Sequence, residues 1–133
     1  MTNRRVATAS VITVPGRLWT ANALRRSHWT TRRRIVEQWR HDTAATARAQ
    51  RVRTYARAVI EVRPQQARGR LADPGAHEPA AKAAIDGLVD AGVLPDDTGE
   101  HVVEVRYHAP VRSEMRMAGQ LVDCLVILLR EAP

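Results

Sequence analysis

The stretch that decides the fold of this chain is EPAAKAAIDGLVDAG, residues 78–92. Pro79 suits the first turn of a helix, where its missing N–H leaves no bond unmade, and Gly92 suits the position just past the last turn. Between them the apolar residues recur at helical spacing and form one stripe: Ala81, Ala84, Ile85 and Leu88. Charged residues step by four and line up beside that stripe: Glu78, Lys82, Asp86 and Asp90. The stretch therefore predicts an amphipathic helix with a charged edge.

Segments with strand-like patterns lie on both sides of this helix. In residues 55–63 apolar side chains alternate with Arg57, Glu61 and Arg63, which is typical of a half-buried strand. Three further strands are expected at residues 11–14, 102–107 and 121–129. A longer helix is expected from an N-cap at Ser27 to about residue 51. We therefore expect a small α/β domain with a mixed β-sheet and two main helices, in the order β-α-β-α-β-β.

The length of 133 residues is that of one domain. Residues 1–10 are polar and basic, a composition typical of a disordered arm, and residues 11–133 are expected to form the folded domain. Residues 17–26 and 64–75 are expected to be loops. No apolar run approaches the roughly 20 residues of a membrane span, and no signal-peptide pattern opens the chain. We expect a cytoplasmic protein without a membrane partner.

Charge is divided sharply along the chain. Residues 1–70 contain 16 arginines and three acidic residues, whereas residues 71–104 contain eight acidic residues and one base, Lys82. The formal net charge is +7. A domain this basic most often binds a polyanion, and nucleic acid is the first candidate. Arginine richness can also reflect a GC-rich genome, but composition alone rarely separates the charges in this way.

The acidic segment contains the groups that phosphodiester chemistry needs. Magnesium prefers oxygen ligands and is usually held by one or two carboxylates together with water and substrate phosphate. Metal ions and a nearby lysine can activate water and neutralise charge on the phosphate. The candidate residues are Asp73, Glu78, Lys82, Asp86, Asp96 and Asp97. An alternative is that the helical members form a solvated salt-bridge ladder worth roughly 0.2–0.5 kcal/mol per pair, and that the last two form a solvated turn.

The stretch KAAIDGLVDAGVLPDD, residues 82–97, resembles the central motif of RusA-type Holliday junction resolvases, K-A-x-x-D-x-L-x-x-A-G-x-x-x-D-D. The matching residues are Lys82, Ala83, Asp86, Leu88, Ala91, Gly92, Asp96 and Asp97. Weaker agreement extends over most of the chain. The resemblance implies a bacterial or phage-encoded endodeoxyribonuclease of recombination and repair. It further implies a homodimer that cuts four-way DNA junctions with Mg²⁺, for which Mn²⁺ can substitute.

The resemblance also implies roles for single residues. By position, Asp97 is similar to the metal-binding catalytic carboxylate of the family and Lys82 to its catalytic lysine, while Asp86 and Asp96 match motif aspartates.

The chain departs from the family just before the helix, where the family has D-x-D-N. Ala76, Glu78 and Pro79 stand at the positions of the two acids and the asparagine. Glu78 can replace the second acid, and Asp73 is the nearest substitute for the first. The expected metal ligands are therefore Asp73, Glu78 and Asp97. Because the first acid is missing, the alternative is a catalytically weakened RusA-like protein that binds branched DNA without cutting it.

Basic and aromatic residues in the first part of the chain are candidates for contacts with DNA. The residues expected to bind DNA are Arg25, Arg26, Arg32, Arg33, Arg34, Trp19 and Asn22. Trp29, like Trp19, is a candidate for stacking on exposed bases, whereas Trp39 has the spacing of a core residue. A basic regulator or RNA-binding protein without an acidic site is a third interpretation, but it leaves the clustered carboxylates unexplained.

Overall fold

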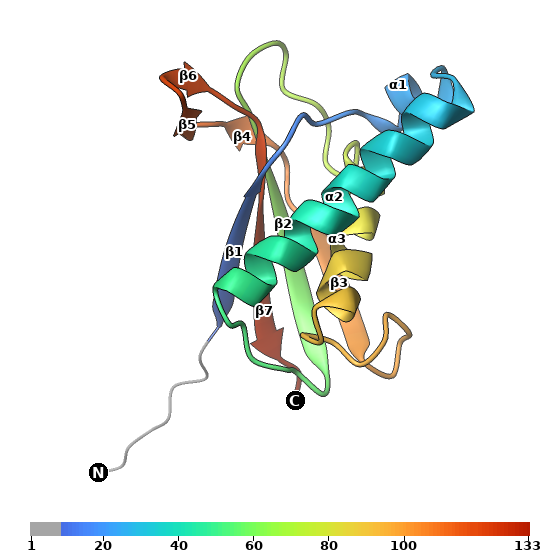
Figure 1. Ribbon diagram of the computed structural model, residues 1–133, viewed down its shortest axis with the longest axis vertical. Helices are drawn as coiled ribbons and strands as arrows, with labels where there is room; N and C mark the ends of the chain where they lie inside the picture. Colours follow the sequence, from blue (N-terminus) through green and yellow to red (C-terminus); the bar gives the residue numbers. More distant parts are fainter. Residues whose placement is uncertain (1–8) are drawn as a thin grey trace.

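One mixed β-sheet with helices packed on one of its faces forms the fold (Figure 1), in a computed structural model that describes residues 9–133. The strand order is β1-β7-β2-β3, and the short β4 also pairs with β2. The strands of this sheet are β1 (Ser10–Pro15), β2 (Ala58–Gln66), β3 (Val102–Tyr107), β4 (Val111–Arg112) and β7 (Cys124–Glu131). The remaining elements are the helices α1 (Ala21–Arg25), α2 (Trp29–Ala49) and α3 (Glu78–Asp90) and the hairpin of β5 (Arg116–Met117) and β6 (Gln120–Leu121). The expected small α/β domain with two main helices is confirmed.

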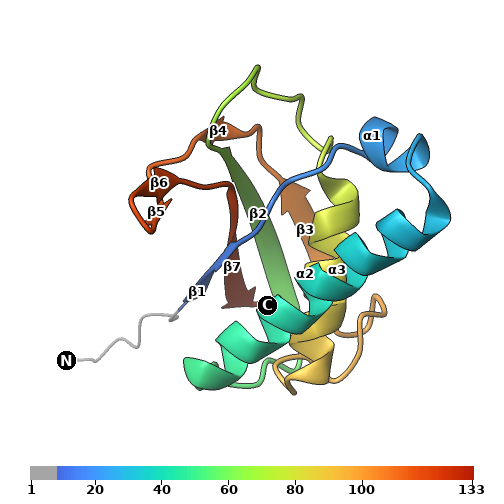
Figure 2. The ribbon, with the colours of Figure 1, turned by 45° about the horizontal axis from the view of Figure 1, so that its top comes forward.

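The core lies between the sheet and helices α2 and α3 (Figure 2). Strand β7 runs antiparallel to both β1 and β2, and Ile127 pairs with Ile12 on one side and with Val62 on the other. These three side chains are at most 1% exposed. Strands β2 and β3 are parallel, so the chain must cross over between them, and α3 makes that crossover.

Helices α2 and α3 approach each other closely because α3 carries a glycine at the crossing. A Cβ atom on Gly87 would lie against the carbonyl oxygen of Arg40 and 3.1 Å from the Cβ of Thr43. At the end of the same contact the guanidinium of Arg40 donates two hydrogen bonds to the carboxylate of Asp90, at 2.6 and 2.8 Å. The two helices therefore form one layer over the sheet.

The segment before α2 differs from the expectation of a loop over residues 17–26. Residues Ala21–Arg25 form the short helix α1, in which the Thr20 side chain accepts a hydrogen bond from the backbone N–H of Ala23. The expected cap at Ser27 is also wrong, because the Ser27 hydroxyl donates to the carbonyl of Ala23. His28 takes the N-cap position of α2 and accepts from the backbone N–H of Thr30.

Strand β2 continues through a proline, where a loop from residue 64 was expected. Strand β3 ends opposite Val62, and β4 joins at Gln65, so Pro64 falls in the gap between two partners. A proline is tolerated in a strand where no acceptor lies opposite its nitrogen, because the missing N–H then leaves no ladder hydrogen bond unmade. The extension carries Gln66 to the base of the loop that contains Asp73.

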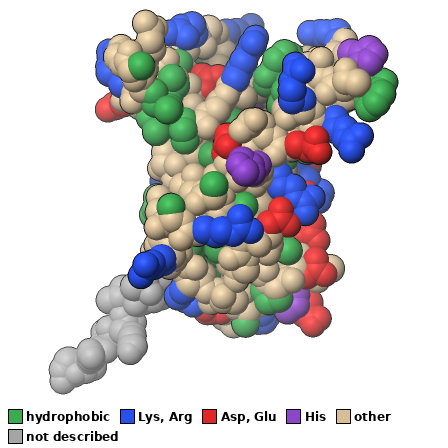
Figure 3. Space-filling view, in the orientation of Figure 1, with side chains coloured by type: hydrophobic (Ala, Val, Ile, Leu, Met, Phe, Trp, Pro, Cys, Tyr) green, Lys and Arg blue, Asp and Glu red, His purple; other side chains and the backbone are tan. Residues whose placement is uncertain are grey.

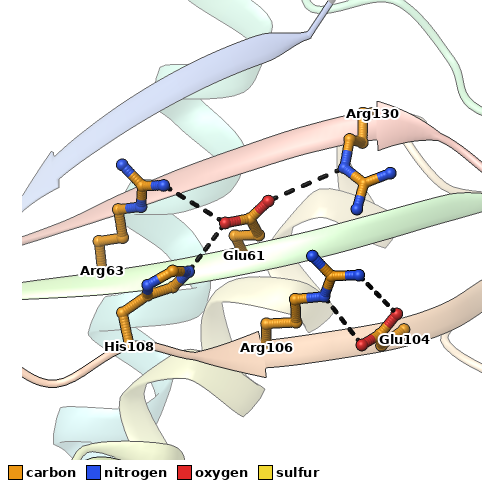
Figure 4. A network of polar contacts seen from close by, with 6 residues as sticks. All are labelled: Glu61, Arg63, Glu104, Arg106, His108 and Arg130. Carbon is orange, nitrogen blue, oxygen red and sulfur yellow. Dashed lines mark hydrogen bonds and ion pairs between the residues drawn. The ribbon is translucent and has the colours of Figure 1, made fainter.

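The face of the sheet opposite the helices carries a charged network (Figure 4). The carboxylate of Glu61 on β2 is central, with His108 Nε2 at 2.8 Å, Arg63 Nη2 at 3.3 Å and Arg130 Nε at 3.8 Å. The side chain of Glu61 is only 16% exposed, and the hydrogen bond from His108 is the main cause that lowers the pKa of its carboxyl group. This network joins β2, β7 and the end of β3.

The expected basic arm of residues 1–10 lies outside the described residues, apart from its last two members. Of these, Ser10 opens β1, one residue earlier than the expected strand. Among residues 9–133, the helices are all too short or too polar to span a bilayer.

We predict that Gly87→Ala destabilises the protein by about 1–3 kcal/mol, because the added methyl group overpacks the contact between α2 and α3. Helix propensity alone would give the opposite sign, a gain of about 1 kcal/mol. Urea unfolding decides between the two. Gly99→Ala is the matched control, since its Cβ would meet nothing within 4 Å. Unchanged or increased stability of Gly87→Ala would show that the helices pack less closely than the structure has them.

We predict that Glu61→Gln lowers the free energy of unfolding by about 0.5–1 kcal/mol at neutral pH and that this loss disappears in acid. The pKa of Glu61 is lowered in the folded state, so its carboxylate stabilises the protein above the ordinary value of 4.5. That contribution is lost as the pH falls below 4.5 through the lowered pKa. Unfolding measured across this range checks the prediction, with Glu114→Gln, an exposed site outside the network, as control. A difference that stays constant with pH would contradict it.

Candidate functional site

Lys82 projects from the solvent side of α3. The helix buries a face of small and aliphatic side chains, among them Ala81, Ala84 and Leu88. Residues four apart on its other side, Glu78, Lys82 and Asp86, remain exposed or half-buried. The Lys82 side chain is 59% exposed and is therefore accessible to a ligand.

Two carboxylates meet the Lys82 ammonium group. Its Nζ lies 3.2 Å from Asp97 Oδ2 and 3.7 Å from Asp86 Oδ1. Asp86 follows one turn later on α3, whereas Asp97 comes from the loop after the helix. We call these three residues the Lys82 cluster. Both carboxylates are therefore ion-paired with the same ammonium group.

The loop that carries Asp97 is anchored by the two residues that follow Gly92. Val93 and Leu94 are both 1% exposed, and the carbonyl of Val93 accepts a hydrogen bond of 2.8 Å from the backbone N–H of Tyr55. Beyond them, Asp96 Oδ1 accepts a hydrogen bond of 2.8 Å from the backbone N–H of Asp97. The adjacent aspartates therefore have different roles, because Asp96 shapes the turn and Asp97 reaches Lys82.

The ion pairs shift the pKa values within the cluster in opposite directions. The hydrogen bond to Asp97 and the charge of Asp86 raise the pKa of Lys82 above its ordinary value. The hydrogen bond from Lys82 lowers the pKa of Asp97. At neutral pH the lysine is therefore a cation that can donate hydrogen bonds and cannot act as a base, and Asp97 is ionised.

Tyr107 is a neighbour of the cluster that the sequence analysis did not identify. Burial is the main cause that raises the pKa of its hydroxyl, and the charge of Glu78 raises it further while Lys82 opposes the change. The hydroxyl is therefore neutral and can donate a hydrogen bond. Tyr107 is the last residue of β3. Because β2 and β3 are parallel, the end of β3 lies at the same edge of the sheet as the end of β2, and α3 begins near that edge. Identifying Tyr107 from the sequence would have required knowing that β2 and β3 are parallel.

The expected metal ligands are not gathered into one group. Glu78 begins α3 and lines a groove toward α2, whereas Asp73 lines a different groove of about 320 Å³ with Asn22 and Arg70. Within residues 9–133, no three side chains of His, Cys, Asp or Glu lie in an arrangement that could hold a metal ion. Asp86 and Asp97 are instead both paired with the ammonium group of Lys82.

The loop that carries Asp73 is held at its base by Gln66. The side chain of Gln66 accepts from the backbone N–H of Ala72 at 2.8 Å and donates to the carbonyl of Arg70 at 2.9 Å. His77 Nε2 lies 3.3 Å from the same Gln66 oxygen, and burial lowers the pKa of this histidine. His77 is therefore a neutral packing residue, and Asp73 stands at the exposed part of an anchored loop.

Several of the candidate DNA-binding residues lie at one end of the molecule. Basic and hydrophobic side chains gather there around α1 and the start of α2, at the top right of Figure 3, and acidic side chains gather along the edge below. Arg25, Arg32 and Arg33 line a groove of about 620 Å³ together with Trp29 and Glu78. We call it the arginine groove.

Four other candidates lie beside this groove or away from it. Arg26 caps the end of α1 and Arg34 is exposed on α2, while Asn22 accepts a hydrogen bond from Arg25. Trp19 is half-buried under the guanidinium of Arg17, which lies 4.5 Å from the centre of its ring. As its spacing predicted, Trp39 is a core residue, 3% exposed.

The sequence was compared with protein-family models and with curated proteins, and neither comparison found a match.

We predict that Lys82→Met raises the pKa of Asp97 toward its ordinary value of 3.8, because the variant loses the ammonium partner. Lys82→Arg keeps a cation at the site and should keep the pKa low. An NMR titration of the side-chain carboxyl carbons measures both. Glu104, whose pKa is lowered by Arg106, is the internal control and should not respond. An unchanged pKa of Asp97 in Lys82→Met would mean that the ion pair does not form in solution.

Proposed function

We propose that this protein is a magnesium-dependent, structure-selective endodeoxyribonuclease of the RusA type. Its substrate is a four-way junction or another branched DNA, and its setting is cytoplasmic recombination or repair. The observation that carries the proposal is the Lys82 cluster, in which Asp86 and Asp97 lie 3.7 and 3.2 Å from one ammonium group. Glu78, one helical turn before Lys82, lines the arginine groove. The spacing of these three residues in the sequence is also that of the family motif.

The residues of the cluster support distinct roles in hydrolysis. Lys82 contacts the scissile phosphate as a permanent cation, which agrees with its raised pKa. Asp97 and Asp86 supply carboxylate oxygens for Mg²⁺, which commonly uses one or two carboxylates. A bound Mg²⁺ supplies an activated water and neutralises charge on the phosphate.

The other acidic residues support this site from its margins. Glu78 lies one helical turn before Lys82 and is the next carboxylate available to the metal. Asp96 keeps the Asp97 turn in shape through its bond to the backbone. Asp73 becomes a ligand only if its loop moves toward α3, and the anchors at Gln66 oppose that movement.

We further propose that the protein acts as a homodimer. A four-way junction has approximate two-fold symmetry and needs two cuts, so a symmetric dimer supplies one site for each. The sheet face opposite the helices is open to a second copy and carries both signs of charge in the Glu61 network (Figure 4). A two-fold axis can bring acidic and basic groups of such a face together.

A protein that binds branched DNA without cutting it is the second candidate function. The missing three-ligand group within residues 9–133 and the alanine at position 76 favour it. This function requires salt-sensitive binding to a junction that is indifferent to magnesium, and no cleavage at any metal concentration.

We predict that the wild-type protein nicks a synthetic four-way junction in Mg²⁺ and not in EDTA. Asp97→Asn and Lys82→Met should each slow nicking by about 10²–10³-fold, a loss typical of removing one electrostatic contact to the reacting group. Glu114→Gln removes one carboxylate outside the cluster and should cut normally. Equal cutting by wild type and Asp97→Asn would overturn the role of Asp97, and binding without cutting by all variants would select the second function.

A further inference from the structure

The arginine groove has an apolar floor beside an exposed aromatic ring. Leu24 on α1 and Val36 on α2 contribute the floor, and Pro79 closes it at the start of α3. Trp29, the first residue of α2, lines the groove and is 56% exposed. An indole this exposed at the edge of an apolar hollow can stack on a flat ligand.

Among the described residues, two of the three arginines around this ring have no acidic partner. Arg25 donates to the Asn22 side chain and Arg32 to the carbonyl of Ser27, both of which are uncharged oxygens. Among the described residues, neither guanidinium has a carboxylate within 4.0 Å. Arg33 has only Glu37, at 3.8 Å and highly exposed, and such a pair is worth little. The groove therefore offers guanidinium groups for an anion next to an aromatic surface.

A nucleotide combines the two chemistries that this groove offers. Its base has an apolar face that stacks on aromatic rings, and its phosphate accepts bidentate hydrogen bonds from arginine. In a continuous duplex the faces of the bases are covered by their neighbours, so an indole on a protein surface cannot reach them. A base without a partner, at a branch point or in a single strand, can turn its face outward.

We propose that the arginine groove is a binding site for an unpaired nucleotide of DNA, with its base on Trp29 and its phosphates on Arg25 and Arg32. The inference rests on the proposed function, because the nucleotide belongs to the same substrate. Glu78 lines the groove and lies one turn before Lys82, so a strand seated on Trp29 leads along α3 to the Lys82 cluster. Selection of branched DNA over duplex then comes from the unpaired nucleotide.

The test is a binding measurement in EDTA, which separates recognition from cleavage. Fluorescence anisotropy gives the Kd of wild type and Trp29→Leu for a continuous duplex, the same duplex with unpaired central nucleotides, and a single strand. Trp29→Leu should weaken binding to the two unpaired substrates by about 5- to 150-fold, as expected for the loss of one stacked base, and leave duplex binding unchanged. Met117→Ala, which shortens another exposed apolar side chain far along the sequence, is the control and should bind all three like wild type.

Two further variants test the phosphate contacts. Arg25→Gln and Arg32→Gln should each weaken single-strand binding and reduce its salt dependence by about 0.7 in the log–log slope. Quenching of tryptophan emission by the single strand should be strong in wild type and largely lost in Trp29→Leu. Thermal melting shows whether each variant is folded.

Each outcome bears on the groove separately from catalysis. Equal weakening of duplex and unpaired DNA by Trp29→Leu, or no weakening of either, overturns the proposal. Tighter binding of a single-stranded RNA of the same sequence overturns its assignment to DNA. If the preference for unpaired DNA depends on Trp29 but no junction is nicked, the proposed nucleotide site is supported and the nuclease proposal fails. If junctions are nicked and Trp29→Leu binds normally, the nuclease stands and the groove fails.

Discussion

The close contact between α2 and α3 is the constraint on which the rest of the structure depends. It exists because Gly87 leaves room for the backbone of Arg40, and the bond between Arg40 and Asp90 closes its far end. With the helices held together, the start of α3 lies beside the first turns of α2, and the arginine groove forms between them. The solvent side of α3 stays open, so Lys82 can meet Asp97 from the following loop. The missing side chain at Gly87 thus contributes to the position of both the arginine groove and the Lys82 cluster.

The elements that could be predicted from sequence are those whose signals are local and agree with one another. Pro79, Gly92 and the apolar stripe between them predicted α3 almost to the residue, and strict alternation predicted most of β2. The errors came where a tertiary contact decides. Ser27 has the chemistry of an N-cap, but its hydroxyl bonds back to α1, and His28 takes the cap. Pro64 stays in a strand only because two neighbouring strands leave a gap there, which no local pattern records.

In the candidate site, too, some contacts follow from the local sequence and others depend on tertiary structure. Lys82 and Asp86 are four apart on one helix, so their proximity follows from helical geometry alone. Asp97 reaches Lys82 from the loop after the helix, which is anchored by the burial of Val93 and Leu94. Asp73 was expected nearby from its distance along the chain, but the bonds of Gln66 hold its loop at another groove. Sequence distance predicts convergence poorly where a loop has its own anchors.

The division of charge along the chain gives the two candidate sites different dependence on ions. Under the proposed binding of DNA, the arginine groove would attract phosphate with release of counterions, so its affinity would fall with monovalent salt. In the Lys82 cluster two carboxylates outnumber one ammonium group, so the cluster by itself repels a phosphodiester at short range. Under the proposed function, a divalent cation held by those carboxylates would reverse the local sign of charge, so that Lys82 and the cation could then both attract the phosphate. Under the proposed function, the strand can therefore be held in the groove without magnesium, but its phosphate enters the cluster only when magnesium is bound.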